Sequence, residues 1–182
     1  MRKPRKIYLA GSLFSLRELW GNFQVMQAIN LDRASGARYQ VHAPQMFLKP
    51  GTPKSLRDQC IINLLGCDGI VVQFDGTELD SGTVVEFVIA KMAGIPCVAL
   101  RTDLRAAGDQ DGGDPWNLMC SFWPGVVPVK IDAAKMVAAC GLHESARGLG
   151  VLLVEALDKA FAARRVKAID KKTLLRLAEV SK

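Results

Sequence analysis

The stretch "CDGIVVQFDGTELDSGTVVEFVIAKMAGIPCVALR", residues 67 to 101, decides the fold. Its first part, "DGIVVQFDG", contains a continuous apolar run, which is typical of a strand buried inside a parallel sheet. Residues 82–94 have helical spacing and end at Gly94, a residue suited to terminate a helix. Residues 95–101, "IPCVALR", read as a second buried strand. The stretch therefore predicts a βαβ unit.

The same alternation runs through the rest of the chain. Further strands are expected in residues 6–11, 38–44 and 125–131, and further helices in 15–34, 54–67 and about 143–165, with Ser15 as a possible N-cap. The sequence thus predicts an α/β, three-layer, doubly wound, flavodoxin-like domain, with a mostly parallel five-stranded sheet and helices on both faces. We assign residues 1–165 to this domain and residues 166–182 to a basic helical tail.

Composition excludes several classes of protein. The 182 residues are 49% apolar and 23% charged, as in a folded cytoplasmic protein. No apolar run approaches the length that spans a bilayer, so no membrane partner is expected. The five cysteines form no CxxC pair, which argues against a disulfide framework and a zinc site. No metal or cofactor is expected.

The net charge of +6 is concentrated near the ends of the chain. Residues 164–182 carry seven Lys or Arg against two acids, and residues 2–6 add four basic side chains. The middle of the chain is close to neutral, without a basic stripe interleaved with aromatic residues. The sequence therefore favours a solvated terminal helix over nucleic-acid binding.

Polar residues gather where the predicted strands end. In doubly wound sheets, ligands bind beyond the carboxyl ends of the strands. Those ends carry Gly11 and Ser12, Gln45, Asp75 to Asp80, and Arg101 to Asp103. Neither GxGxxG nor a P-loop is present, and His42 and His143 lie too far apart in the sequence to suggest a pair.

Three carboxylates remain as candidates for chemistry. Asp80 is suited to cap the helix that follows it, and Asp68 directly precedes a strand, so both have a structural explanation. Glu86 lies between apolar residues in "TVVEFVIA", where an unpaired carboxylate is costly. It needs a partner, and the phenol of Tyr8 is a suitable one.

The chain resembles the nucleoside 2-deoxyribosyltransferase family. The matching elements are "IYLAGSLFS", "PQ" after the second strand, "CDGIVVQFDGTELDSGTVVEFVIAKMAGIPCVAL" and "NLM" at 117–119. They follow the family's order from residue 7 to about 120. The resemblance implies an enzyme that moves a 2-deoxyribosyl group between nucleobases, with a deoxynucleoside and a free nucleobase as its partners.

The resemblance also implies roles for individual residues. Glu86 matches the nucleophile and Tyr8 the tyrosine that holds it, while Asp80 and Asp68 match carboxylates that contact the sugar hydroxyl and the base. One of these two aspartates delivers the proton, and which one is left open. Asn117 and Met119 match residues that close a neighbouring subunit's sugar pocket, so a homo-oligomer of at least two chains is expected. The full expected substrate-binding set is Gly11, Ser12, Gln45, Asp75, Gly82, Asn117 and Met119.

Two other functions stay open at this stage. Related enzymes hydrolyse nucleoside 5′-monophosphates, and Ser12 stands at a position that they use for phosphate. They carry a serine in place of Asp80, however, and a carboxylate there would repel a 5′-phosphate. A non-catalytic nucleoside- or nucleotide-binding module is the second alternative. The sequence leaves open purine against pyrimidine preference and transfer against hydrolysis.

Overall fold

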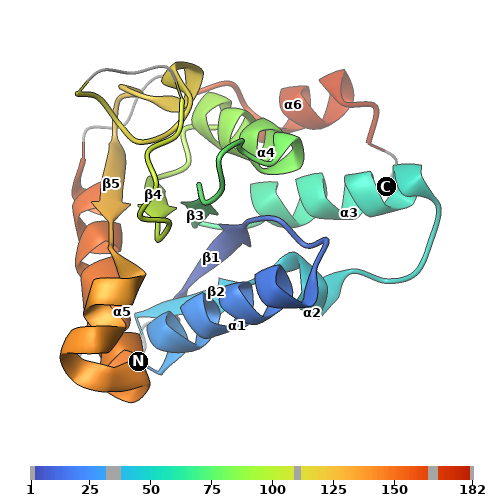
Figure 1. Cartoon of the computed structure of the whole chain (residues 1–182). Coiled ribbons are helices and arrows are strands. Elements are labelled where there is room, and N and C mark those ends of the chain that lie inside the picture. The colour runs from blue at the N-terminus through green and yellow to red at the C-terminus, as the bar shows by residue number, and fades with distance from the viewer. Residues whose placement is uncertain (1–2, 32–37, 109–111, 164–167, 181–182) are drawn as a thin grey trace.

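The protein is built on a parallel β-sheet of five strands. The computed structural model describes residues 3–31, 38–108, 112–163 and 168–180. The strands are β1 (Arg5–Ala10), β2 (Tyr39–His42), β3 (Gly69–Gln73), β4 (Cys97–Arg101) and β5 (Val126–Lys130). They lie in the order β2-β1-β3-β4-β5, and every neighbouring pair is parallel (Figure 1). This is the flavodoxin-like α/β fold that the sequence predicts.

Helices cover both faces of the sheet. On one face lie α1 (Leu16–Asn30) and α5 (Ala133–Ala162), and on the other lie α3 (Pro53–Leu65), α4 (Ser81–Met92) and α6 (Lys171–Leu177) (Figure 1). Two short helices, α2 (Pro44–Phe47) and the 3₁₀ helix η2 (Leu118–Cys120), follow β2 and β4. Two apolar clusters form the core, one on each side of the sheet.

The alternation of side chains along β1 determines on which face of the sheet Tyr8 lies. Successive side chains of a strand point to opposite faces. Ile7 and Leu9 pack with α1 and α5, whereas Tyr8 and Ala10 pack with α3 and α4. Tyr8 therefore lies on the face of the sheet that carries Glu86.

The helix N-caps that the sequence predicts at Ser15 and Asp80 are present in the structure. The hydroxyl of Ser15 accepts from the backbone N–H of Glu18 at the start of α1, and the carboxylate of Asp80 accepts from Thr83 N at the start of α4. Gly94, just beyond α4, adopts a φ of 65°, which glycine reaches without strain.

Helix α5 differs from its prediction. It begins at Ala133 instead of near residue 143, and Gly141 interrupts it with a φ of 76°. By length and composition alone α5 is apolar enough to cross a membrane, with a mean hydropathy of 1.2. In the structure Leu153, Val154 and Leu157 of this helix pack into the core against the sheet.

The C-terminal helix α6 packs on its own domain along one side, while most of its other side chains are exposed. Leu174 of α6 is buried in the core cluster that includes α3 and α4. Arg57 Nη2 donates to Ala178 O at 3.0 Å, and Lys171 Nζ donates to Leu65 O. Residues 164–167 and 181–182, which carry part of the basic run, lie outside the described residues.

Close contact between α1 and α5 depends on Gly150. A Cβ added there would lie 2.3 Å from the carbonyl oxygen of Ala28, so the two helices would have to move apart. We expect Gly150→Ala to lower the free energy of unfolding by about 1–3 kcal/mol, measured by chemical denaturation.

Gly148→Ala is the matched control on the same helix. Its added Cβ would meet only the flexible end of Met136, at 3.3 Å. Alanine also favours the helix by up to about 1 kcal/mol. Equal losses of stability in the two variants would contradict the close-contact explanation.

Candidate active site

A buried tyrosine and a glutamate from distant parts of the chain form the centre of the site. Tyr8 Oη of β1 donates to Glu86 Oε1 of α4 over 2.6 Å. Tyr8 has no exposed surface, and Glu86 is partly buried. The sequence thus correctly indicated that this carboxylate requires a partner and that Tyr8 is able to supply one.

The surroundings shift the protonation of both groups. Burial raises the pKa of Glu86 to about 7, the hydrogen bond from Tyr8 lowers it, and the negative charge of Asp80 raises it further. Burial, and then the charge of Glu86, raises the pKa of the Tyr8 phenol far above its ordinary value. The phenol therefore stays a donor, and Glu86 gains and loses its proton near neutral pH.

Cys60 of α3 lies beside this pair. Burial raises the pKa of its thiol, followed by the charge of Glu86, while a hydrogen bond with Tyr8 lowers it. The sequence showed Cys60 only as one of several scattered cysteines. Its approach to Tyr8 depends on how α3 packs on the sheet, so no local motif marks it.

Asp80 is the N-cap residue of α4. Its Oδ2 accepts from Thr83 N at 2.7 Å and from Thr83 Oγ1 at 2.8 Å. Its Oδ1 has no hydrogen bond among the described residues. Gly82 leaves room for this carboxylate, because a Cβ there would lie 3.2 Å from Asp80 Oδ2. Capping thus uses one oxygen of Asp80 and leaves the other for a ligand.

A cavity of about 530 Å³ opens beyond the carboxyl ends of β1, β3 and β4. Its lining includes the predicted Ser12, Asp75 and Asp80. Tyr8, Glu86 and Gln45 are not among the described residues that line it. The full lining is Ser12, Arg17, Glu18, Gly21, Asn22, Gln73, Asp75, Gly76, Glu78, Leu79, Asp80, Thr102, Asp103 and Arg105.

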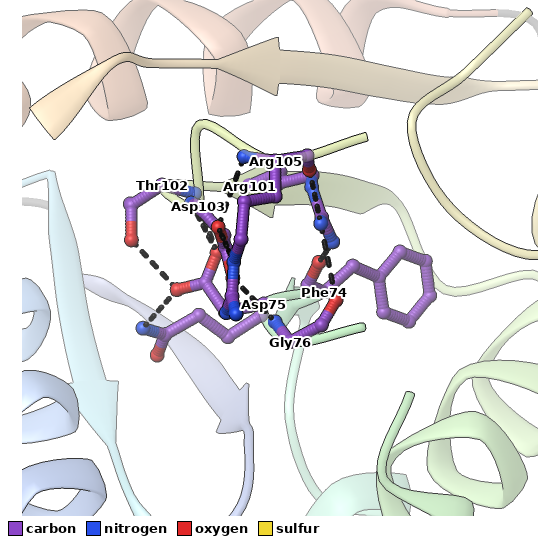
Figure 2. A network of polar contacts seen from close by, with 8 residues as sticks. Phe74, Asp75, Gly76, Arg101, Thr102, Asp103 and Arg105 are labelled. Atoms are coloured by element: carbon purple, nitrogen blue, oxygen red, sulfur yellow. Dashed lines mark hydrogen bonds and ion pairs between the residues drawn. The ribbon is translucent and has the colours of Figure 1, made fainter. Parts of the chain in front are cut away.

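Asp75 has a structural task in the cavity wall. Its Oδ1 accepts from the backbone N–H groups of Thr102 and Asp103, at 2.6 and 2.9 Å (Figure 2). Its Oδ2 accepts from Thr102 Oγ1 at 2.6 Å. Both oxygens thus join the loops after β3 and β4, so the structure gives the predicted substrate-binding Asp75 a role in holding the wall.

Arg101 completes this network through its buried side chain. Its guanidinium, 1% exposed, donates to the carbonyl oxygens of Phe74, Gly76 and Arg105 (Figure 2). Arg105 in turn forms an ion pair with Asp103 at 2.5 Å, which holds the pKa of that carboxyl well below its ordinary value. The network makes the cavity rim a fixed structure.

Two glutamines near the strand ends have unsatisfied polar atoms. The side-chain nitrogen and oxygen of Gln45 are buried without a hydrogen-bond partner among the described residues, as is Gln73 Oε1. Gln45 lies on α2, whose Phe47 ring is 6.0 Å from the Tyr8 ring. Buried polar groups without partners are costly, so these amides are suited to bind a ligand.

Asp68 does not belong to this site. It directly precedes β3, where its Oδ2 accepts from the backbone N–H of Lys6 at 2.8 Å. Because β1 and β3 are parallel, this position lies at the amino edge of the sheet, opposite the cavity. The predicted catalytic role of Asp68 is therefore wrong for the geometry of this chain.

The remaining predicted residues lie apart from the cavity or support it. Gly11 is buried, and a Cβ there would lie 3.0 Å from Asn22 Oδ1, so it permits close packing of β1 on α1. Asn117 and Met119 lie in an exposed segment, where Asn117 Oδ1 accepts from Met119 N at 2.9 Å. Their predicted action on a neighbouring subunit stays a prediction.

Five polar residues of the cavity lining were not anticipated from the sequence, namely Arg17, Glu18, Asn22, Gln73 and Arg105. Asn22 is 3% exposed and donates through Nδ2 to Ser12 O at 2.9 Å. Gln73 ends β3, and Glu18 lies in the first turn of α1. A polar residue closing the apolar run "GIVVQ" was a usable signal for Gln73. Asn22 is a polar residue on the buried face of a helix, which was a weaker signal.

Metal binding has no evident place in the described part of the chain, where no three His, Cys, Asp or Glu residues gather as a ligand set. The polar groups that converge are carboxylates, amides and a phenol. These are suited to bind a polar organic molecule by hydrogen bonds.

Fold and site together define a flavodoxin-like α/β protein with a buried Tyr–Glu pair beside an acidic cavity. A family model described as nucleoside 2-deoxyribosyltransferase matches residues 7–119. The chain belongs to this family. A search of curated proteins found no match.

Three solved structures are similar to this chain. A 2-desoxiribosyltransferase from Leishmania mexicana is 23% identical, with 68% of this chain and 90% of that chain covered and a TM-score of 0.52. A conserved protein from Enterococcus faecalis V583 is 24% identical over 97% and 98% of the chains, with a TM-score of 0.47. A 2-deoxyribosyltransferase from Bacillus psychrosaccharolyticus is 21% identical over 63% and 79%, with a TM-score of 0.44.

The Tyr8 hydrogen bond has a measurable effect on Glu86. Because this bond lowers the pKa of Glu86, Tyr8→Phe is expected to raise that pKa above about 7. Carboxyl ¹³C chemical shifts followed through a pH titration measure it. Tyr39→Phe is the control, since Tyr39 bonds Asp158 instead. An unchanged or lower Glu86 pKa in Tyr8→Phe would contradict the interpretation.

Proposed function

We propose that this protein transfers the 2-deoxyribosyl group between nucleobases through a covalent intermediate on Glu86, and hydrolyses the intermediate when water is the acceptor. The observation that carries the proposal is the 2.6 Å hydrogen bond between Tyr8 and Glu86 in a chain of the nucleoside 2-deoxyribosyltransferase family. It supplies a carboxyl group that is partly ionised near pH 7 and is fixed in direction by the hydrogen bond from Tyr8.

The first half-reaction breaks the bond between C1′ and the base nitrogen. The electron pair leaves with the base, which takes a proton from an acid, and positive charge develops at C1′. A carboxylate oxygen of Glu86 then forms a bond to C1′, as in retaining glycosidases. Tyr8 holds Glu86 so that one oxygen is directed while the other is available.

In the second half-reaction another base attacks C1′. The bond from C1′ to Glu86 breaks, the carboxylate is restored, and the incoming base returns a proton to the acid. Two displacements at C1′ retain its configuration, and a shared covalent intermediate implies ping-pong kinetics. Attack by water instead of a base yields free deoxyribose.

Asp80 is the candidate for the acid. The sequence left Asp80 and Asp68 as alternatives, and Asp68 lies at the opposite edge of the sheet. Asp80 lines the cavity and raises the pKa of Glu86 through its charge, so the two carboxylates are neighbours. Gln45, with its unsatisfied buried amide, is proposed to contact the base.

A second copy of the chain completes the proposed site. Asn117 and Met119 are exposed on their own chain, and Met119 is 77% exposed. Because both residues match family positions that act on a neighbouring subunit, we propose that they close the sugar pocket of a neighbour in a cytoplasmic homo-oligomer.

Product analysis tests the proposed reaction. The protein is incubated with a 2′-deoxynucleoside, with and without a different free base, and the products are separated by chromatography. We expect a new deoxynucleoside that forms only with the added base. Free base and deoxyribose alone would make the protein a hydrolase, and cleavage of only the 5′-monophosphates would favour the nucleotide N-glycosidase alternative.

Glu86→Gln separates an enzyme from a binding module. Loss of the nucleophile is expected to lower kcat by about 10⁴-fold or more, with substrate binding retained. Calorimetry measures binding, and the product assay measures turnover. Full activity in Glu86→Gln would mean that another group is the nucleophile.

The two aspartates are expected to differ. Asp80→Asn removes the proposed acid and should lower kcat by about 10²–10⁴-fold. Asp68→Asn changes only the amino edge of the sheet and should leave kcat/KM within about threefold of the unmodified protein. A large loss of activity in Asp68→Asn with little change in Asp80→Asn would show that Asp68, and not Asp80, is the acid.

A further inference from the structure

The lining of the cavity includes a glutamine that the proposed reaction does not use. Gln73 is the last residue of β3, at the carboxyl edge of the sheet. Val71, two residues earlier, packs with the core cluster of α1 and α5, and residues two apart on a strand share a face. Gln73 is therefore directed to the side of the sheet opposite Tyr8, which packs with α3 and α4.

The amide group of Gln73 has one atom with a partner and one without. Its Nε2 donates to Asp75 Oδ2 over 3.4 Å, which is long for a hydrogen bond. Because the carboxylate of Asp75 would repel an amide oxygen, this contact sets the direction of the amide. Its Oε1 is buried and has no hydrogen-bond partner among the described residues. The atom left unsatisfied is therefore an acceptor.

A second amide oxygen lies close by. A Cβ added to Gly11 would lie 3.4 Å from Gln73 Oε1 and 3.0 Å from Asn22 Oδ1, so both oxygens are near the same glycine. Asn22 is 3% exposed, and its Nδ2 donates to Ser12 O at 2.9 Å, which sets the direction of its amide. Gln73 and Asn22 both line the cavity. A ligand group that fits between these two acceptors is a hydrogen-bond donor.

The side chain of Gln73 is able to turn towards such a donor. Gln73 as a residue is only partly buried, and its bond to Asp75 is long and weak. The last side-chain torsion of a glutamine has a broad energy minimum, so a small rotation costs little. Asp75 keeps its hydrogen bonds from Thr102 and Asp103 when Gln73 turns. A donor from a ligand would remove the cost of an unsatisfied Oε1.

The proposed reaction determines which part of the substrate reaches Gln73. Gln45, proposed to contact the base, lies on α2, and Phe47 of this helix packs with the core cluster that contains Tyr8. The base and C1′ thus lie on the α3 and α4 side of the sheet. Asp80 is close to the nucleophile and also lines the cavity. The part of the nucleoside that carries the sugar hydroxyls therefore extends past Asp80 into the cavity.

We propose that Gln73 positions the sugar: its amide oxygen accepts a hydrogen bond from a hydroxyl of the deoxyribosyl group, and this contact holds C1′ at Glu86. The inference rests on the proposed function. The hydroxyl is that of C3′ or of C5′, because a 2-deoxyribosyl group bound to a base through C1′ carries no other. A sugar held at a second point reacts from fewer orientations, so the contact contributes to kcat/KM.

Gln73→Leu tests the contact, because leucine removes the acceptor and still fills most of the space. The value of kcat/KM is measured for a 2′-deoxynucleoside and for its 2′,3′-dideoxy and 2′,5′-dideoxy analogues. We expect Gln73→Leu to lower kcat/KM for the 2′-deoxynucleoside by about five- to fiftyfold. For one of the two analogues kcat/KM is expected to stay within about threefold of the unmodified protein. That analogue identifies the hydroxyl that Gln73 binds.

Gln24→Leu is the matched control, because Gln24 is an exposed glutamine of α1. The same substitution there is expected to leave all three values of kcat/KM within about threefold of those of the unmodified protein. An equal loss for all three substrates in Gln73→Leu would show a structural role alone and would overturn the proposal. An unchanged kcat/KM for the 2′-deoxynucleoside in Gln73→Leu would overturn it as well.

Binding decides the inference separately from the reaction, and without a variant. The side-chain amide signal of Gln73, assigned through its own backbone, is followed by NMR while the 2′-deoxynucleoside or either analogue is added to the unmodified protein. If nothing is cleaved, the proposed function fails, but a shift that is lost with one analogue still supports the contact. An unchanged signal, or equal shifts with all three compounds, overturns the inference even where turnover is observed.

Discussion

The fold holds the carboxylate of Glu86 among apolar side chains with one phenol as its hydrogen-bond partner, and the rest of the site depends on this constraint. Burial raises the pKa of Glu86 to about 7 from its ordinary value of 4.5. The unfolded chain loses this proton first as pH rises, so stability falls between these values, by about 3 kcal/mol when the shift is fully expressed. The two apolar clusters of the core must offset this cost.

The parallel sheet explains how the pair and the cavity come to lie together. Strand alternation directs Tyr8 towards α4, and parallel order brings the ends of β1, β3 and β4 to one edge. The loops at that edge are joined by Asp75 and supported by the buried guanidinium of Arg101. Orientation contributes strongly to catalysis, so a rim fixed by hydrogen bonds suits a reaction at one carbon atom.

Periodicity was sufficient to predict the fold, because buried strands and amphipathic helices follow from local pattern. The pairing of Glu86 with Tyr8 was also accessible, since a carboxylate between apolar residues requires a partner. Asp68 was assigned to the active site from the sequence, although a residue directly before a parallel strand lies at the amino edge of the sheet, away from the cavity. Cys60 and Glu18 were missed because their contacts depend on how α3 and α1 pack, which no local motif records.

The negative field of the cavity links the choice of substrate to the proposed chemistry. Cleavage of the glycosidic bond develops positive charge at C1′, and fixed carboxylates stabilise such charge without reorganisation. The same carboxylates raise the energy of a bound 5′-phosphate. A site that binds phosphate would need positive charge at the β1–α1 turn, which would oppose the developing charge at C1′. In the proposed reaction the carboxylate of Asp80 avoids that conflict, because its charge favours a neutral nucleoside whose sugar becomes cationic.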